Sequence, residues 1–356
     1  MLMSDDRDIT EALCAQVTEA LERRTTVRPR GGDSKAFYGE AINSQPLELS
    51  EHRGIVNYQP TELVITARAG TPLEEIEAAL AAQRQMLPFE PPHFGAGATL
   101  GGAVASGLSG PRRPWLGAVR DLVLGMRVIN GRGEHLHFGG EVMKNVAGYD
   151  VSRLMTGSLG TLGVITEVSL KVLPAPEQEL TLVQSADQGS ALRRFREWCA
   201  EPLPLSGLAY LDGQLFIRLS GTEAGIAAAR QRLGGDESAM AFWVALREQR
   251  LAFFSEQPQL AVWRVSVPPA VPALEDLAPV LVDWAGGLRW LRSDAPAQTI
   301  REWAERHGGH ATCFRGDCDA SRFHPLSEAQ LALHRRIKQA LDPQAIFSPG
   351  RMYRSL

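Results

Sequence analysis

GAGATLGGAVASGLSG (residues 95–110) contains thirteen Gly, Ala, Ser or Thr residues in sixteen positions. A second glycine-rich stretch, TGSLGTLGVIT, follows at residues 156–166. Such segments bury little apolar surface, but their nearly bare backbone lets peptide N–H groups approach a phosphate closely and lets φ become positive. Two of them in one chain predict a large, phosphate-bearing cofactor that lies along the main chain.

The first stretch does not have the spacing of a Rossmann-type dinucleotide fold. Gly95, Gly97 and Gly101 do not match the G-x-G-x-x-G pattern, and the stretch follows Pro91-Pro92 rather than a strand. Because that fingerprint must come directly after a strand, the sequence disfavours this fold.

The composition is that of a globular protein of 356 residues, a length that predicts two domains. The net charge of -4 argues against nucleic acid as the main partner. No stretch of 18 apolar residues and no N-terminal signal core occur, so we expect a cytoplasmic protein. The cysteines are widely scattered, which excludes a disulfide framework and an iron–sulfur run: Cys14, Cys199, Cys313 and Cys318.

Periodicity and turn residues predict alternating helices and strands. Helices are expected at 9–23, 71–83, 188–199, 222–233, 237–254, 297–307 and 327–341. The helix at 71–83 is expected to begin with a capping box, with Thr71 as N-cap, Pro72 next and Glu74 third. Strands or hairpins are expected at 27–30, 63–67, 122–138, 164–173, on both sides of Asp212-Gly213, and at 260–267. The segment Leu173-Pro-Ala-Pro-Glu177 marks a domain boundary.

Several short motifs then occur in a characteristic order. They are Arg30-Gly-Gly-Asp-Ser-Lys35, Ala98-Thr-Leu-Gly-Gly102, Lys144-Asn-Val-Ala-Gly-Tyr-Asp150, Gly157-Ser-Leu-Gly-Thr-Leu-Gly-Val-Ile165 and Pro349-Gly-Arg351. This order resembles the vanillyl-alcohol-oxidase-type, or PCMH-type, flavoprotein superfamily. Within it, the chain is similar to the FAD-binding E subunits of bacterial glycolate oxidases. The resemblance is strong over residues 25–175, diffuse over 176–340, and returns at the tail.

The resemblance implies an α+β fold in three parts. A PCMH-type FAD-binding domain of two α/β subdomains would span residues 1–176. A cap domain of antiparallel sheet and helices would span 177–340, and a tail at 341–356 would return to the FAD domain.

The same resemblance implies that FAD lies between loops 30–35 and 98–107, which would hold its pyrophosphate from two sides. Thr99 and Ser106 would add hydroxyl donors, and Gly101-Gly102 would open a short helix whose N-terminus favours negative charge. Val164 and Ile165 would bond the adenine edge through their main chain. The expected cofactor-binding residues are Arg30, Gly31, Gly32, Asp33, Ser34, Lys35, Ala98, Thr99, Leu100, Gly101, Gly102, Ser106, Gly107, Lys144, Gly160, Gly163, Val164, Ile165 and Arg351.

Some of these residues have two readings. Lys144 would offset charge on reduced flavin, or would contact a phosphate or lie on the surface; Tyr149 is its polar neighbour on the side that analogy assigns to the cofactor. Arg351 would reach the flavin or clamp two domains together. The first glycine-rich stretch contains neither His nor Cys, so we expect noncovalent FAD.

No catalytic residue and no metal site can be assigned. Related D-lactate and glycolate D-type dehydrogenases carry a His-x-Gly-Asp-Gly-x-x-His metal run, whereas this chain has His307, His310, Cys313 and Cys318 at irregular spacing. That spacing favours helix-end polar residues and a buried thiol. His135 and His137 share a strand face but have no third ligand, which favours a solvated hairpin face. His93 lies near the isoalloxazine or is a polar loop residue.

The resemblance implies the FAD-binding subunit of a multi-subunit 2-hydroxy-acid (glycolate) dehydrogenase or oxidase. Its partners would be a paralogous flavin subunit and an iron–sulfur subunit, with glycolate as substrate, and any membrane association would be peripheral, at the inner membrane through those partners. Two alternatives stay open: a self-sufficient FAD-dependent hydroxy-acid or alcohol dehydrogenase, and a non-catalytic flavoprotein scaffold. The exact substrate, the electron acceptor and the stoichiometry cannot be read from the sequence.

Overall fold

The computed structural model describes residues 6–140, 149–273 and 280–356. The chain forms two compact units. The first consists of Met1–Ser109, Gly117–Ala175 and Pro325–Leu356, and the second of Gly110–Leu116 and Pro176–His324. The division expected from sequence ended the second domain at residue 340 and left residues 110–116 in the first, so the chain divides differently at both places.

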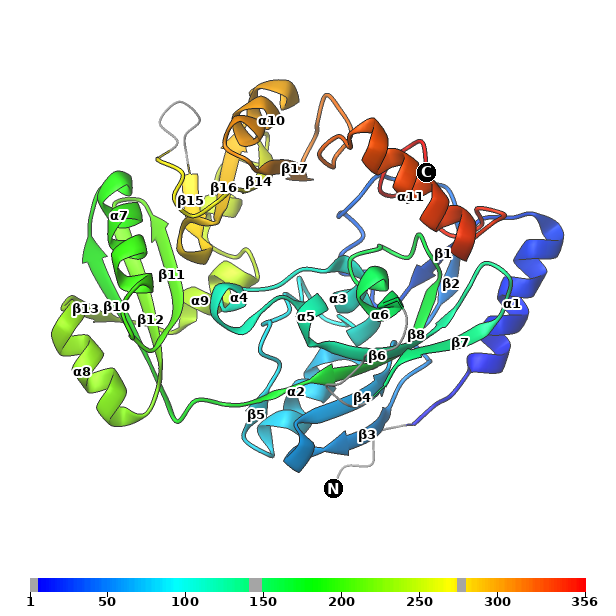
Figure 1. The fold of residues 1–356 in the computed structure, drawn as a ribbon, viewed down its shortest axis with the longest axis horizontal. Coiled ribbons are helices and arrows are strands. Elements are labelled where there is room, and N and C mark those ends of the chain that lie inside the picture. Colours follow the sequence, from blue (N-terminus) through cyan, green and yellow to red (C-terminus); the bar gives the residue numbers. More distant parts are fainter. Residues whose placement is uncertain (1–5, 141–148, 274–279) are drawn as a thin grey trace. The chain divides into compact units, whose positions relative to one another are not determined.

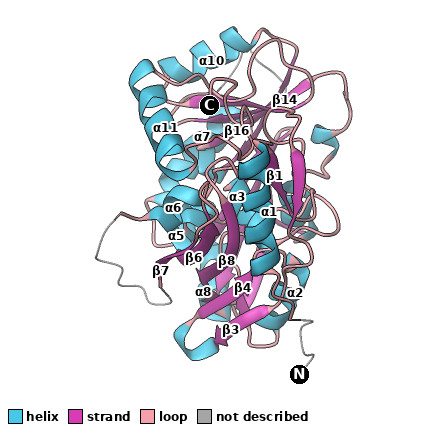
Figure 2. Ribbon diagram, turned by 90° about the vertical axis from the view of Figure 1, so that its right-hand side faces the viewer, coloured by secondary structure: helices cyan, strands magenta, loops and turns pink. Residues whose placement is uncertain are grey.

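The first unit is built on a five-stranded antiparallel sheet, whose strands β3, β4, β8 and β6 are seen side by side in Figure 2. In sheet order the strands are β3 (Ile55–Gln59), β4 (Val64–Arg68), β8 (Val164–Lys171), β6 (Val123–Ile129) and β7 (His135–Gly139). The first unit also contains two sheets of two strands each. In one, β1 (Val27–Arg30) runs parallel to β2 (Gln45–Glu48), and in the other, β5 (Gln85–Met86) runs antiparallel to β9 (Leu173–Pro174).

Helices cover the sheets of the first unit and bury one apolar core. They are α1 (Thr10–Arg23), α2 (Leu73–Ala81), α3 (Leu100–Ser106), α5 (Val119–Leu122), α6 (Val151–Met155) and α11 (Glu328–Leu341), with a 3-10 turn η1 (Pro60–Glu62). Helix α3 packs against β8 and β4. In α1, Leu13, Val17 and Ala20 are buried at helical spacing, as the periodicity predicts.

The second unit is built on an eight-stranded sheet in which every pairing is antiparallel (Figure 1). In sheet order the strands are β13 (Asp236–Ser238), β10 (Gln178–Ser185), β12 (Gln214–Gly221), β11 (Leu205–Leu211), β15 (Val280–Asp283), β16 (Leu288–Ser293), β14 (Ala261–Ser266) and β17 (His310–Arg315).

The helices of the second unit are α4 (Arg113–Leu116), α7 (Gln188–Cys199), α8 (Glu223–Leu233), α9 (Ala241–Arg247) and α10 (Ala297–Arg306), with 3-10 turns η2 (Ala252–Phe254) and η3 (Trp284–Gly286). Helix α8 packs on β10 and β12, whereas α10 packs on β17 near the other end of the strand order. The predicted α+β class is confirmed. The helices expected at 9–23, 188–199, 222–233, 297–307 and 327–341 are present.

The capping box expected at Thr71 is wrong. Helix α2 begins at Leu73 after a non-helical Pro72, and no side chain caps it. The Thr71 hydroxyl, which is buried, accepts the N–H of Gly54 at 2.9 Å and donates to the carbonyl of Gly54 at 3.2 Å. Because this loop occupies the hydroxyl, it cannot reach the first turn of the helix.

The single helix expected at 237–254 is also wrong. Residues Asp236–Ser238 pair with β10 as strand β13, α9 spans only Ala241–Arg247, and a 3-10 turn follows at Ala252–Phe254. Gln249 has φ +54°, a left-handed conformation that ends the helix.

Within the described residues, no helix is long and apolar enough to cross a membrane.

Candidate cofactor-binding cleft

The first unit contains a cleft where the glycine-rich segments meet, which we call the glycine cleft. Its walls come from the loop after β1, the N-terminal turns of α3, the turn before β8, and Arg351. The lining includes most of the residues expected from sequence: Arg30, Gly31, Gly32, Asp33, Ser34, Lys35, Thr99, Gly101, Gly102, Ser106, Gly160, Gly163, Ile165 and Arg351.

Four expected residues do not line the glycine cleft. Ala98, Leu100 and Val164 are buried in the apolar core. Gly107 ends α3 with φ +67° and packs on Gly157, so that a Cβ there would lie 3.0 Å from the Gly157 Cα. Lys144, the fifth residue to be placed, lies outside the described residues.

Glycines let the cleft-forming loops touch one another. A Cβ on Gly32 would lie 1.5 Å from the carbonyl oxygen of Gly97, and one on Gly31 would lie 2.3 Å from the Thr99 Oγ1. A Cβ on Gly101 would lie 2.6 Å from the Ala69 Cβ. Any side chain at these positions would push the loops apart, so the bare backbone closes the walls of the cleft as well as exposing peptide groups.

The loop after β1 supplies the exposed peptide N–H groups of the cleft that could bind an anion. Among the described residues, the main-chain N–H groups of Gly31, Gly32, Asp33 and Ser34 have no protein acceptor. Four successive peptide donors at the wall of a cleft form a site suited to phosphate oxygens.

The first glycine-rich stretch, residues 95–110, offers fewer free peptide donors to the cleft than the loop after β1. The N–H of Leu100 donates to the carbonyl of Thr71, and the N–H of Gly101 donates to the carbonyl of Ala69 at 2.8 Å. Thr99 caps α3, because its hydroxyl accepts the N–H of Gly102 at 3.3 Å. The N–H of Gly101 is therefore bound by the residue that follows β4 and is not available to a phosphate. Gly102, half-buried, presents its Cα to the cleft.

Basic side chains surround the same loop. Arg28 bonds Asp33 at 2.8 Å, and Arg30 pairs with Glu48, whose hydrogen bond raises the pKa of Arg30. The Lys35 Nζ lies 3.3 Å from the carbonyl of His93. With Arg351 these residues bring four cations to a lining that contains one carboxylate, Asp33, which suits a doubly charged pyrophosphate.

Arg351 clamps the chain that follows this loop. Its guanidinium group donates to the carbonyls of Glu40, Ala36 and Tyr38 at 2.6–2.8 Å, and the residue is 8% exposed. All of these residues belong to the first unit. Arg351 thus orders residues 36–40 and also lines the cleft, a clamp within one unit rather than between domains.

The start of β8 leaves a free strand edge at the cleft. Strand β8 pairs with β6 as far as Val164, but its pairing with β4 ends at Arg68 and Glu167. The edge of Val164 and Ile165 that faces away from β6 is therefore beyond the end of β4. A planar base could bond main-chain groups there.

The remaining polar candidates lie in ordinary structural contacts. His93 Nε2 is 3.2 Å from Glu77 Oε1, and Tyr149 is 98% exposed. His307 ends α10 and bonds the Trp303 carbonyl, while burial raises the pKa of the Cys313 thiol to about 12. In the part of the chain that the structure describes, no three His, Cys, Asp or Glu side chains gather as a metal site.

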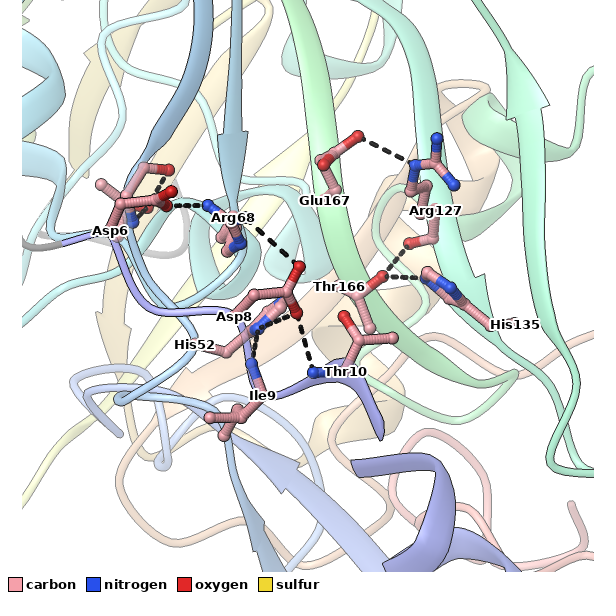
Figure 3. A network of polar contacts seen from close by, with 12 residues as sticks. Asp6, Asp8, Ile9, Thr10, His52, Arg68, Arg127, His135, Thr166 and Glu167 are labelled. Atoms are coloured by element: carbon pink, nitrogen blue, oxygen red, sulfur yellow. Dashed lines mark hydrogen bonds and ion pairs between the residues drawn. The ribbon is translucent and has the colours of Figure 1, made fainter. Parts of the chain in front are cut away.

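A second polar cluster joins the N-terminal segment to the five-stranded sheet (Figure 3). Buried His52 accepts the N–H of Ile9 on Nδ1 at 3.2 Å and also bonds the main chain of Thr166. Asp8 accepts the N–H of Thr10 and pairs with Arg68. The His135 Nε2 lies 3.0 Å from the Thr166 hydroxyl, on the neighbouring part of the sheet. Among the described residues, His135 belongs to no group of three side chains that could bind a metal ion.

Stability of the first unit should fall in mild acid because of His52. Burial lowers the pKa of His52 below 6.5, so the folded protein binds fewer protons than the unfolded chain. The stabilisation that the folded protein gains from neutral His52 is complete above pH 6.5 and is lost as the pH falls through the pKa of His52 in the folded protein. His52→Gln should flatten the pH dependence of the unfolding free energy, measured by urea titration, by at most about 1.4 kcal/mol per pH unit. Exposed His137→Gln is the control, and an unchanged slope in His52→Gln would refute the assignment.

Several lining residues were not among those expected from the sequence. They are Arg28, Pro29, Ala36, Leu49, Ala69, Ala105 and Leu159. Leu159 has φ +53°, an uncommon conformation for a residue other than glycine, and lies between Gly157 and Gly160, which also have positive φ. Arg28 has the clearest retrospective signal, because it precedes the Gly-Gly turn on the strand that leads into it.

Comparison with known proteins gives consistent results. Residues 9–139 match a protein family described as FAD binding domain. The chain is 53% identical over 350 residues to glycolate oxidase subunit GlcE of Escherichia coli (strain K12), covering 98% of this chain and 99% of that protein. It is 30% identical over 176 residues to glycolate oxidase subunit GlcD of Bacillus subtilis (strain 168), covering 49% of this chain and 37% of that protein.

The fold is also similar to a solved structure. Alkyldihydroxyacetonephosphate synthase aligns with a TM-score of 0.66 over 95% of this chain and 74% of that chain. The sequence identity is 16%, so this likeness concerns the fold alone.

Proposed function

Because this chain belongs to the family of glycolate oxidase subunit GlcE, we propose that it is the FAD-binding subunit of a multi-subunit 2-hydroxy-acid dehydrogenase that oxidises glycolate to glyoxylate. The resemblance stated from sequence is confirmed by 53% identity over 98% of this chain. The structural observation that supports the proposal most is the loop at residues 31–34, whose peptide donors line a cationic cleft.

The glycine cleft fits the diphosphate of FAD. Gly31, Gly32 and Ser34 would donate to phosphate oxygens through their main chain, and Lys35 would balance their charge. The free edge of Val164 and Ile165 would receive the adenine. Bound FAD supplies two-electron oxidation; the residues of this chain bind it, orient it and set the charge around it.

We propose that the FAD is noncovalent. A covalent flavin needs a His or Cys side chain against the ring, and the lining of the glycine cleft contains neither among the described residues.

The proposed complex contains a paralogous flavin subunit and an iron–sulfur subunit. The likeness of about half of this chain to the protein named glycolate oxidase subunit GlcD supports a second, related subunit in the complex. The four scattered cysteines of this chain form no cluster motif, which supports a separate carrier for single electrons. We place the complex in the cytoplasm, at the inner membrane only through its partners.

Reconstitution tests this function. The purified chain, a GlcD-type subunit and an iron–sulfur subunit would be assayed for dye reduction by glycolate, singly and together. We expect a rate only with all three. Reduction by this chain alone would favour a self-sufficient dehydrogenase, and an unchanged rate when its FAD is removed would favour a scaffold; either result would overturn the proposal.

A further inference from the structure

A second pocket of the first unit is lined by α6, the turn before β8, α11 and the C-terminal tail (Figure 2 labels both helices). We call it the α11 pocket. Its volume is about 210 Å³, and its apolar walls come from Leu154, Leu162, Ile337, Met352 and Leu356. Among the described residues, none lines both this pocket and the glycine cleft, so the α11 pocket is not part of the proposed FAD site.

A buried hydroxyl of the α11 pocket has no hydrogen-bond partner. Ser158 lines the pocket and is 5% exposed, and among the described residues nothing bonds its Oγ. The other hydroxyls of the lining are used, because Thr156 donates to the Ser152 carbonyl at 3.1 Å and Thr161 donates to the Ser158 carbonyl at 2.7 Å. The Lys338 ammonium already donates to three oxygens. Since an unpaired buried hydroxyl is costly, Ser158 indicates an occupant that supplies the missing bond.

Helix α11 leaves apolar surface exposed beside this pocket. Although α11 has 14 residues, its one buried residue is Lys338, whereas a helix on a globular protein usually buries an apolar stripe. Leu333 is 49% exposed and lies one turn before Ile337 of the lining. Leu154, on α6, is 39% exposed. Exposed apolar side chains next to an apolar pocket are typical of a surface that binds another protein.

The charges around the α11 pocket are mainly basic. Helix α11 carries Arg335, Arg336 and Lys338 but only one carboxylate, Glu328 in its first turn. Arg335 and Arg336 are exposed and stand between the lining residues His334 and Ile337, so their charges flank the pocket. A partner that binds here should therefore be acidic beside its apolar contact.

We propose that the α11 pocket receives a tyrosine or tryptophan side chain of a partner subunit, from a segment with acidic residues beside that aromatic. An apolar cavity of about 150 Å³ holds benzene, so the larger α11 pocket suits a phenol or indole ring. The O–H or N–H of that ring would donate to the Ser158 Oγ, and the acidic neighbours would meet Arg335 and Arg336. Aromatic side chains in such pockets provide much of the binding energy of interfaces. The inference rests on the proposed function, which supplies the partner subunits, and adds the surface on which one of them binds.

Assembly of the FAD-loaded, full-length chain with a GlcD-type subunit and an iron–sulfur subunit tests the surface. Leu154→Asp and Leu333→Asp should each weaken assembly by about tenfold or more, because a carboxylate replaces an apolar contact and repels an acidic partner. Val244→Asp is the matched control, since Val244 of α9 is 48% exposed, and it should leave assembly unchanged. Circular dichroism would be recorded for every variant, and Leu333→Asp still tests the surface if Leu154→Asp unfolds.

Charge reversal tests the acidic character of the partner. Arg335→Glu combined with Arg336→Glu should slow association by about tenfold at low salt, and less at high salt. Arg196→Glu, on the exposed side of α7, is the control for a change of charge and should not alter the rate. An association rate that the double variant leaves unchanged would refute an acidic partner.

Two small probes test the pocket itself. Calorimetric titration would compare p-cresol, which resembles a tyrosine side chain, with toluene, which lacks the hydroxyl. We expect p-cresol to bind the FAD-loaded chain more tightly and to inhibit assembly. Ser158→Ala should weaken p-cresol binding by up to about tenfold and leave toluene binding unchanged, which a merely structural serine would not do. Equal effects of Ser158→Ala on both probes would overturn the proposed hydrogen bond.

The possible failures can be told apart. Folded Leu154 and Leu333 variants that assemble like the wild type would overturn the surface and leave the proposed function standing. Self-association of this chain that Leu154→Asp abolishes would assign the surface to a second copy and also overturn the inference. A wild-type chain that binds FAD but never assembles with the other subunits would refute the proposed function, and the inference with it.

Discussion

Replacement of Gly102 by valine is expected to remove most of the bound FAD while the chain stays folded. Gly102 lines the glycine cleft, and a Cβ there would meet only the Thr99 Oγ1, at 3.2 Å. The valine methyl groups would therefore project into the space proposed for the pyrophosphate rather than into the core. Overlap of this kind costs about 3 kcal/mol, or about a hundredfold in affinity.

The second unit offers a closely matched control for this variant. Gly225 occupies the same position after the N-cap Thr222 of α8, its N–H bonds the Thr222 hydroxyl at 3.3 Å, and its Cβ would also meet that oxygen at 3.2 Å. Gly225→Val should keep its FAD. Flavin would be measured in the supernatant after heat denaturation, so flavin that stays with the wild-type precipitate would refute noncovalent binding, and full retention in Gly102→Val would refute the pyrophosphate site.

Replacement of Lys338 by methionine should destabilise the first unit strongly. Lys338 is the one buried residue of α11, and its ammonium group donates to the carbonyls of Thr161 and Phe347 at 2.6 and 2.7 Å and to Asp342 at 2.8 Å. Asp342 is 1% exposed, so methionine would leave its carboxylate buried without a cation. Breaking such a pair on one side costs about 3–5 kcal/mol.

Urea titration of the free energy of unfolding measures this loss. Arg335→Met, on the exposed side of the same helix, is the control and should change stability by no more than about 0.5 kcal/mol. A Lys338→Met protein as stable as that control would show that the Lys338–Asp342 pair does not hold α11 and the tail together.

Elements that depend on local chemistry could be predicted from sequence. The hairpin at 122–138 forms because Asn130 accepts the N–H groups of Arg132 and Glu134 within the turn. Helix α1 forms where apolar residues recur at helical spacing. Most residues that line the cleft could be predicted, because glycine-rich segments bury little apolar surface and therefore indicate a role other than core packing.

Features that depend on distant partners could not be predicted. The Gly101 N–H is bound by Ala69, and the Thr71 hydroxyl is bound by Gly54, because strands formed earlier in the chain bring those acceptors close. Trp284 bonds Gly110 across 174 residues, and this bond holds residues 110–116 to the second unit. No periodicity or turn signal reports such a contact, so the place of residues 110–116 in the second unit had no signature in the sequence.

The guanidinium of Arg351 binds the carbonyl of Glu40, which precedes it by 311 residues. During synthesis the N-terminal part of a chain emerges and begins to fold first. The loop that precedes Glu40 must therefore wait until residue 351 has been synthesised before its supporting bonds exist. Loading of the flavin is, on this view, a late step of biogenesis, and a ribosome-bound nascent chain should stay colourless.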